Sequence, residues 1–278
     1  MAKVPISFEV YPPKSEASAP DLYRAIDALS ALGPSFISVT FGAGGSETKN
    51  SLEVLGYIKS AGVSPLAHLT CAGTTTQTAS ALVREFLDAG ITDFLALRGD
   101  LPSGQRDLPA DSLRTASELV SLIGEVRETP GKTAVAAFPN GHPESGESRS
   151  DIAALLAKQE AGADFAITQL FFYAKDYLDF VSLARESGVT IPILPGIMPI
   201  ISPKRLERVI ELTGERNPED FAELLNLAAD SAERIEVGIS WAAALVSELV
   251  EAGAPGIHLY AFNEHERVTE VLRRAKLV

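Results

Sequence analysis

Polar side chains suited to proton transfer stand within or just after short apolar runs of this chain. Glu9 lies in the first such run, Asp100 follows the fourth and Gln169 follows the sixth. Burial among apolar neighbours favours the protonated form of a carboxyl group, so Glu9 could donate a proton near neutral pH. Asp100 could accept hydrogen bonds from a heterocycle with N–H groups, and the Gln169 amide is both donor and acceptor. The alternative for Glu9 is a structural ion pair with a Lys or Arg across the core.

Further candidate binding residues occupy similar positions in the first half of the chain. Thr40 begins a glycine-rich loop whose backbone could approach a ligand closely, although an ordinary turn would use the same glycines. Arg98 and Gly99 precede Asp100, and the Arg98 guanidinium could bind a phosphate or pair with that carboxylate. His68 is as compatible with a core position as with catalysis.

The second half of the chain adds four candidates. His142 follows the fifth apolar run, and Asp151 and Lys158 belong to the next amphipathic stretch, whose helix Asp151 could instead cap. Tyr260, at the end of the last run, could stack on a flat heterocycle or pack in the core. The four histidines and one cysteine show no metal-ligand spacing, so we predict no metal site.

Eight apolar runs must position these groups, and each fits a strand buried on both faces. The runs alternate with stretches of amphipathic helical period, and no linker-like segment divides the chain. The pattern predicts an α/β fold, a single (β/α)8 TIM barrel over residues 1–278, in which strand ends and the following loops share one rim. The predicted strands are Ile6–Val10, Phe36–Val39, Ser64–Leu69, Phe94–Leu97, Ala134–Phe138, Phe165–Thr168, Ile191–Ile197 and Gly256–Ala261.

The composition of the chain argues against nucleic-acid binding, secretion and membrane insertion. A net charge of -13 would repel nucleic acid, and no basic stripe offsets it. The lone Cys71 cannot form an intramolecular disulfide, and the N-terminus lacks the features of a secretory signal. No apolar run approaches the roughly 20 residues that span a bilayer. We therefore expect a cytoplasmic protein that does not bind nucleic acid or membranes, of undetermined oligomeric state.

Taken in order, these runs and loops resemble the catalytic barrel of methylenetetrahydrofolate reductase over nearly the whole chain. The matching segments are Ser7–Glu9 with Pro12–Pro13, Ser38–Ala43, His68–Cys71, Ala96–Pro102, His142–Glu144, Ala161–Ala163, Ile167–Gln169 and Pro195–Ile197. The resemblance implies a (β/α)8 barrel that reduces 5,10-methylenetetrahydrofolate to 5-methyltetrahydrofolate with electrons from NADH or NADPH. In that family FAD usually relays the hydride.

The resemblance also implies a role for each matching residue. Glu9 matches the general acid that helps open the methylene bridge to a reactive iminium. Asp100 matches the carboxylate beside the pterin and flavin, and Gln169 matches a side chain that contacts the folate ring. Thr40 and Tyr260 are further expected substrate contacts. The positions that match flavin contacts are Thr40, His68, Arg98, Gly99, Asp100, Ala116, His142, Asp151 and Lys158.

The chain departs from the family pattern where flavin and the folate tail would lie. The segment Gly45–Asn50 lacks the usual arginines, and Glu264 stands where the family often has an arginine for the glutamyl carboxylate. Either Arg267 or another base substitutes, or tail recognition differs. Residues that differ from the family in polarity, or lack its aromatic ring, are Thr115, Phe138, Ala154 and Val209.

Two cofactor hypotheses follow from these departures. In the first, FAD binds and alternates between nicotinamide and folate. In the second, the flavin is lost and NADH or NADPH transfers hydride directly to the folate iminium. Two other function classes stay open: a noncatalytic folate-binding barrel, and a flavin-dependent amine or proline oxidoreductase.

Overall fold

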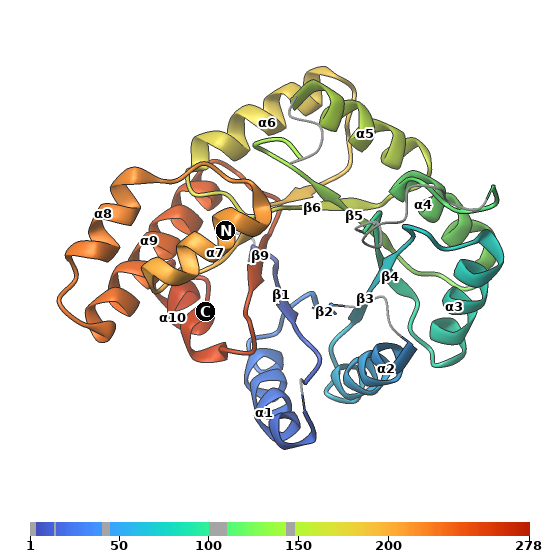
Figure 1. The fold of residues 1–278 in the computed structure, drawn as a ribbon, viewed down its shortest axis with the longest axis horizontal. Coiled ribbons are helices and arrows are strands. Elements are labelled where there is room, and N and C mark those ends of the chain that lie inside the picture. The colour runs from blue at the N-terminus through green and yellow to red at the C-terminus, as the bar shows by residue number, and fades with distance from the viewer. Residues whose placement is uncertain (1–3, 14, 41–44, 100–109, 143–147) are drawn as a thin grey trace.

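A ring of parallel strands forms the centre of the molecule, with helices around its outside (Figure 1). The computed structural model describes residues 4–13, 15–40, 45–99, 110–142 and 148–278; for residues 16, 45–49, 148 and 149 it describes only the backbone. The nine strands run in the order β7-β6-β5-β4-β3-β2-β1-β9-β8, and every pairing is parallel. The predicted barrel is therefore confirmed.

The strands agree closely with the predicted apolar runs. They are β1 (Ile6–Val10), β2 (Phe36–Val39), β3 (Pro65–Thr70), β4 (Asp93–Leu97), β5 (Thr133–Ala137), β6 (Phe165–Thr168), β7 (Ile193–Leu194), β8 (Gly196–Ile197) and β9 (Ile257–Tyr260). The predicted seventh strand is divided into β7 and β8 at Pro195, which has no N–H to donate to a ladder. β7 pairs with β6 and β8 with β9, so the divided strand fills the seventh position of the barrel.

The helices fill the intervals between strands. They are α1 (Ala19–Ser30), α2 (Gly45–Ser60), α3 (Thr76–Asp88), α4 (Ala116–Val126), α5 (Ser148–Glu160), α6 (Ala174–Glu186), α7 (Pro203–Thr213), α8 (Glu219–Leu227), α9 (Ser231–Glu251) and α10 (His265–Arg274), with a short 3-10 helix at Glu16–Ser18. Three helices, α7 to α9, lie between β8 and β9. In the described ranges, no helix is long and apolar enough to cross a lipid bilayer.

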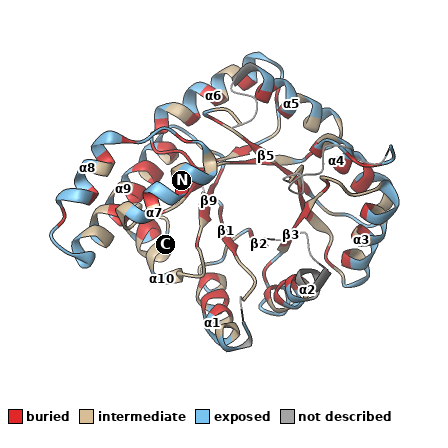
Figure 2. Ribbon diagram, in the orientation of Figure 1, coloured by how far each residue is buried: buried red, intermediate tan, exposed pale blue. Residues whose placement is uncertain are grey.

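Side chains along β1 point alternately outward to the helices and inward to the barrel, and this alternation places two polar residues in the barrel interior. Ile6, Phe8 and Val10 belong to the large apolar core between the strands and the helices, so Ser7 and Glu9 point into the barrel. Figure 2 shows that burial is concentrated on the strands and on the helix faces turned toward them. A second apolar cluster fills the barrel itself and comprises Phe36, Leu66, Leu95, Ala134 and Ile167.

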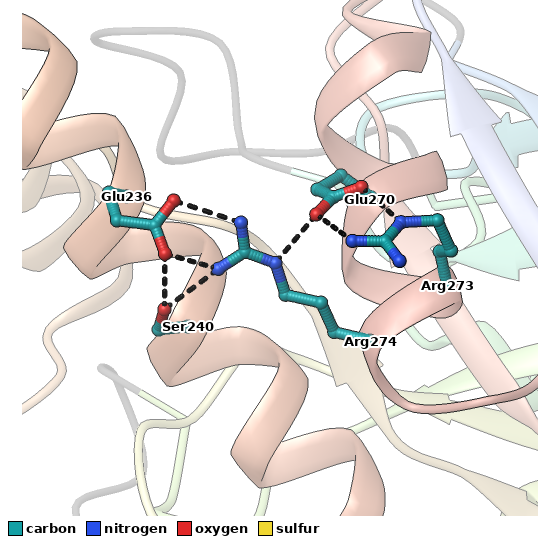
Figure 3. Close-up of polar contacts among 5 residues, drawn as sticks. All are labelled: Glu236, Ser240, Glu270, Arg273 and Arg274. Atoms are coloured by element: carbon teal, nitrogen blue, oxygen red, sulfur yellow. Dashed lines mark hydrogen bonds and ion pairs between the residues drawn. The ribbon is translucent and has the colours of Figure 1, made fainter.

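An ion-pair network joins α9 to α10 in the helical layer (Figure 3). Arg274 donates from Nη2 to Glu236 Oε2 at 2.9 Å and from Nε to Glu270 Oε1 at 2.7 Å. Arg273 binds the other Glu270 oxygen at 2.7 Å, and Ser240 donates to Glu236. Hydrogen bonds from Arg273 and Arg274 lower the pKa of Glu270 to about 2. The network therefore joins the last helix to its neighbour α9.

Candidate active site

A buried carboxyl group lies between two imidazoles inside the barrel. The Oε2 atom of Glu9 is 3.6 Å from Nε2 of His68 on β3 and 3.8 Å from Nε2 of His258 on β9. All three residues are buried. Behind His258, the Oγ atom of Ser7 is 2.9 Å from Nδ1. Among the described residues, these two histidines are the only ion-pair partners of Glu9, so the alternative of a Lys or Arg partner is not observed there.

Burial keeps several neighbours of Glu9 uncharged at neutral pH. Desolvation lowers the pKa of His68, partly opposed by the Glu9 charge. Desolvation, together with the same charge, raises the pKa of Tyr260 and of Tyr11 well above the ordinary value. A charge that develops on Glu9 therefore meets fixed protein dipoles instead of mobile water. These surroundings suit a carboxyl group that transfers a proton.

A pocket of about 660 Å³ opens beside the C-terminal ends of β4 and β5. It is lined by six of the residues predicted to contact a cofactor, namely Arg98, Gly99, Ala116, His142, Asp151 and Lys158. They come from the loop after β4, the start of α4, the loop after β5 and α5. The volume is typical of ligand sites, and the Arg98 and Lys158 cations suit a phosphate-bearing ligand.

Hydrogen bonds to the backbone hold the α5 side of this pocket. The Lys158 Nζ atom donates to the carbonyl oxygen of Ala136 at 2.9 Å and lies 5.9 Å from the ring centre of Phe138. Desolvation lowers the pKa of Lys158 to about 8, although Asp151 opposes the shift. The Oδ2 atom of Asp151 accepts the backbone N–H of His142 at 2.8 Å, which ties the loop after β5 to α5.

The backbone on the β4 side of the pocket packs closely against β3 at a glycine. Gly99 has φ +77°, and a Cβ atom there would lie 2.9 Å from the Cβ of Thr70 on β3. A side chain at this position would therefore clash with the neighbouring strand. Asp100, the second predicted catalytic carboxylate, follows immediately and lies outside the described residues.

The predicted substrate contacts lie at the ends of other strands. The Oε1 atom of Gln169 accepts the N–H of Leu170 at 2.9 Å, and the Tyr260 hydroxyl donates to the carbonyl of Thr168 at 2.7 Å. Thr40 directly follows β2 and precedes residues 41–44, which are outside the described ranges. The roles predicted for these three residues stay predictions.

The predicted site thus divides into two groups. One surrounds Glu9 in the barrel interior, and the other lines the pocket between β4, β5, α4 and α5. Thr40 and His68, which were expected to contact flavin, are not among the residues that line this pocket. His68 instead faces Glu9. The flavin contact expected of His68 stays a prediction.

Departures from the family pattern have local structural explanations. Thr115 is the N-cap of α4: its hydroxyl accepts the N–H of Glu118, and the Glu118 carboxylate accepts the N–H of Thr115, each at 3.2 Å. Sequence analysis missed this capping box, although the spacing Thr-x-x-Glu is its signature. Phe138 packs edge-on against His142, with ring centres 4.7 Å apart. Val209 is buried in an apolar cluster.

Glu264 is held between two arginines beside the end of β9. The Nη1 atom of Arg205 on α7 donates to Glu264 Oε2 at 2.9 Å, and Arg267 pairs with the same oxygen. The Arg205 guanidinium also lies 5.4 Å from the ring centre of Phe262. The cluster Arg205–Glu264–Arg267 therefore combines two basic side chains with one acidic side chain, which leaves an excess of positive charge. Sequence analysis missed Arg205, because only the fold brings α7 to Glu264.

Ser7 and His258 were also missed as functional candidates. Each stands two residues before a predicted site residue, Glu9 and Tyr260 respectively, and a period of two places them on the same strand face. That signal was available in the sequence. The pairing of Ser7 with His258 across β1 and β9 was not, because it depends on how the first and last strands meet.

Comparisons with known proteins show which family the sequence matches. The family profile described as methylenetetrahydrofolate reductase matches residues 1–276. The 5,10-methylenetetrahydrofolate reductase of Escherichia coli (strain K12) is 35% identical over 266 residues, which are 95% of this chain and 88% of the relative. Methylenetetrahydrofolate reductase (NADH) 1 of Arabidopsis thaliana is 32% identical over 286 residues, 98% of this chain and 48% of the relative.

Solved structures support the fold. A Clostridium thermocellum protein that binds two copies of 5-methyl-5,6,7,8-tetrahydrofolic acid superposes with a TM-score of 0.67 and 17% identity, covering 99% of this chain and 94% of that one. Phosphonopyruvate hydrolase superposes with a TM-score of 0.53 and 11% identity, covering 98% of this chain and 80% of that one.

Proposed function

The chain belongs to the methylenetetrahydrofolate reductase family, and we propose that it reduces 5,10-methylenetetrahydrofolate to 5-methyltetrahydrofolate with electrons from a nicotinamide dinucleotide. The observation that carries this proposal is the buried Glu9, which lies beside two histidines and beside no Lys or Arg of the described residues. Such a carboxyl group can give up its proton to a reactant that enters from the rim of the barrel.

The reaction adds one proton and one hydride to the folate. Glu9 donates its proton to N10 as the bond between N10 and the bridging carbon breaks, which leaves an iminium at N5. The hydride then adds to the bridging carbon and converts it to the methyl group. Glu9 ends the cycle as a carboxylate and takes a new proton from solvent, so one proton is consumed in each turnover.

We propose that the pocket between α4 and α5 holds the redox cofactor. Arg98 and Lys158 would neutralise a diphosphate, which both FAD and a nicotinamide dinucleotide carry. Phe138 and Ala154 make the wall of this pocket less polar than in the family, and Thr115 replaces an aromatic residue there; these changes motivate the flavin-free hypothesis. In either case the bound cofactor supplies hydride, and this chain's residues orient it and exclude water.

The absorbance spectrum of the protein as isolated separates the two cofactor hypotheses. Flavin bands, with stoichiometric FAD released on denaturation, support the first. A colourless protein that oxidises NADH or NADPH only when methylenetetrahydrofolate is present supports direct transfer. Comparing the two nicotinamides in that assay decides which is preferred. Turnover of proline without folate would instead favour the amine or proline oxidoreductase alternative, and no turnover of any of these substrates would favour a noncatalytic barrel.

Cofactor binding should weaken as pH rises through the pKa of Lys158. Because that pKa is lowered to about 8, the ammonium group is charged below pH 8 and increasingly neutral above it. We expect the dissociation constant of the cofactor to increase above pH 8 in the wild-type protein. Lys158→Met should bind more weakly at pH 7, by about tenfold, and should lose most of this pH dependence. Fluorescence or calorimetric titration at several pH values would measure both.

We further propose that Arg205 and Arg267 receive the glutamyl carboxylate of the folate tail. Glu264 orients both guanidinium groups, and the net positive charge of the cluster removes the repulsion expected from Glu264 alone. The KM for methylenetetrahydrofolate should rise in Arg205→Ala. Arg208→Ala is the matched control, since Arg208 lies on the same helix and pairs with the exposed Glu211.

A further inference from the structure

The two imidazoles that face Glu9 have unsatisfied nitrogens. The Nε2 atoms of His68 and His258 are fully buried, and neither has a hydrogen-bond partner in the structure. Both are directed at the same Glu9 oxygen, at 3.6 and 3.8 Å, which is longer than a hydrogen bond. A buried polar atom without a partner is costly, and a native protein seldom keeps one without a use. The nearest acceptor is Oε2 of Glu9. A movement of about an ångström would bring this oxygen within hydrogen-bond distance of either Nε2 atom.

The Ser7 hydroxyl lies where it can select which nitrogen of His258 carries the proton. The Ser7 hydroxyl has one proton and two acceptors within reach, Nδ1 of His258 at 2.9 Å and the carbonyl oxygen of Ile257 at 3.4 Å. Either atom of the shorter contact can be the donor, and we take the hydroxyl as the donor to Nδ1, because its one proton is then used in the shorter contact. In neutral imidazole one nitrogen is a donor and the other an acceptor. With Nδ1 as the acceptor, the proton of His258 is on Nε2 and points at Glu9.

We propose that Ser7 and His258 are positioning residues for the acid step, and this proposal rests on the proposed function. Ser7 holds His258 in its Nε2–H tautomer, and that N–H stabilises the negative charge that forms on Glu9 Oε2 when the proton leaves for N10. The O–H bond of Glu9 breaks and the N10–H bond forms, while the proton of His258 stays on Nε2 throughout. His68 contributes a second imidazole at the same oxygen.

The long distances between Glu9 Oε2 and the two imidazoles are consistent with stabilisation of the charged form of Glu9. A donor that is 3.8 Å from Glu9 Oε2 contributes little before the proton is transferred, and it forms a charge-assisted hydrogen bond only as the carboxylate develops. Stabilisation confined to the charged state lowers the barrier without tightening substrate binding. The arrangement therefore predicts an effect on kcat with little effect on KM.

Two substitutions at His258 separate the two ring nitrogens. The amide of His258→Gln can place a donor near the Nε2 position, whereas that of His258→Asn reaches only the Nδ1 position. We expect kcat to fall about 10- to 100-fold in His258→Asn, with KM within about twofold, and His258→Gln to recover much of the loss. His265→Gln, a partly exposed position at the start of α10, should match the wild type. Equal losses in the Asn and Gln variants would overturn the proposal.

Combining these changes with Glu9→Gln tests whether His258 acts through Glu9. Residues that work as one unit are strongly non-additive. Adding His258→Asn to Glu9→Gln should therefore lower the residual kcat by less than about twofold. A further loss as large as that in the wild-type background would show that His258 supports the fold or another step, and the proposal would fail.

The tautomer can be read without any turnover. In protein labelled with ¹⁵N-histidine, two-bond proton–nitrogen correlations distinguish the two tautomers, and the signal of His258 is identified by its absence from His258→Gln. We expect the Nε2–H form in the wild type and a loss of this preference in Ser7→Ala. An Nδ1–H form in the wild type would overturn the proposal even if the protein reduces methylenetetrahydrofolate. The expected tautomer in a protein without that activity would leave the geometry intact and refute the proposed function instead.

Discussion

Glu9→Gln should lower the kcat for methylenetetrahydrofolate reduction by about 10²- to 10⁴-fold. The substitution keeps the shape of the side chain and removes the proton that opens the methylene bridge. Oxidation of NADH or NADPH that depends on the folate measures the loss, and KM should change much less than kcat.

A matched control variant and an unfolding measurement test whether the loss of kcat is specific to Glu9. Glu266→Gln makes the same chemical change at a side chain that is 75% exposed, and it should leave kcat unchanged. The thermal unfolding of Glu9→Gln should show that the barrel is intact. Wild-type kcat in a folded Glu9→Gln protein would remove Glu9 from the mechanism and favour the noncatalytic-barrel alternative.

Gly238→Ala should destabilise the protein by about 3 kcal/mol. Gly238 lies within α9 where that helix crosses the segment after β8, and a Cβ atom there would lie 2.0 Å from the carbonyl oxygen of Ile200. Backbone cannot move aside as a flexible side chain can. The helix would have to shift away from the barrel, opening the packing around it. Urea unfolding followed by circular dichroism would measure the change.

Gly124→Ala is the matched control for this prediction. Gly124 is also within a helix, α4, but a Cβ atom there would meet nothing within 4 Å. Alanine has the higher helix propensity, so this variant should be more stable by about 0.5 to 1 kcal/mol. Opposite signs for the two variants are the expected result. Destabilisation by both would mean that helix propensity and packing have been assigned wrongly at these positions.

Local sequence determined the strands because each is a short apolar run between helical stretches. Three of the predicted strands, β1, β2 and β6, have the observed bounds, since polar or turn residues limit them on both sides. The seventh run was predicted as one strand, but Pro195 divides it into β7 and β8. The prediction missed this division because an apolar run indicates that a segment is buried. It does not indicate where the hydrogen bonds between neighbouring strands are interrupted.

The candidate site was only partly accessible from the sequence. Six predicted cofactor contacts share one pocket, because each follows a strand and all strands end at the same rim. His68 was predicted to contact flavin, and the structure places it in the barrel interior facing Glu9, which leaves that prediction untested. A position at the end of a strand predicts the rim. It does not predict whether a side chain leans inward toward the barrel axis or sideways toward a neighbouring loop.

The sequence by itself determined the barrel, the family and the identity of Glu9 as a buried acid, because these depend on periodicity and on local motifs. Only the tertiary structure decided which groups surround that acid. Ser7 and His258 are 251 positions apart, and they meet because closure of the barrel pairs β1 with β9. Arg205 reaches Glu264 for a similar reason. Contacts across a closed sheet depend on register and curvature, which are properties of the whole ring and not of any single segment.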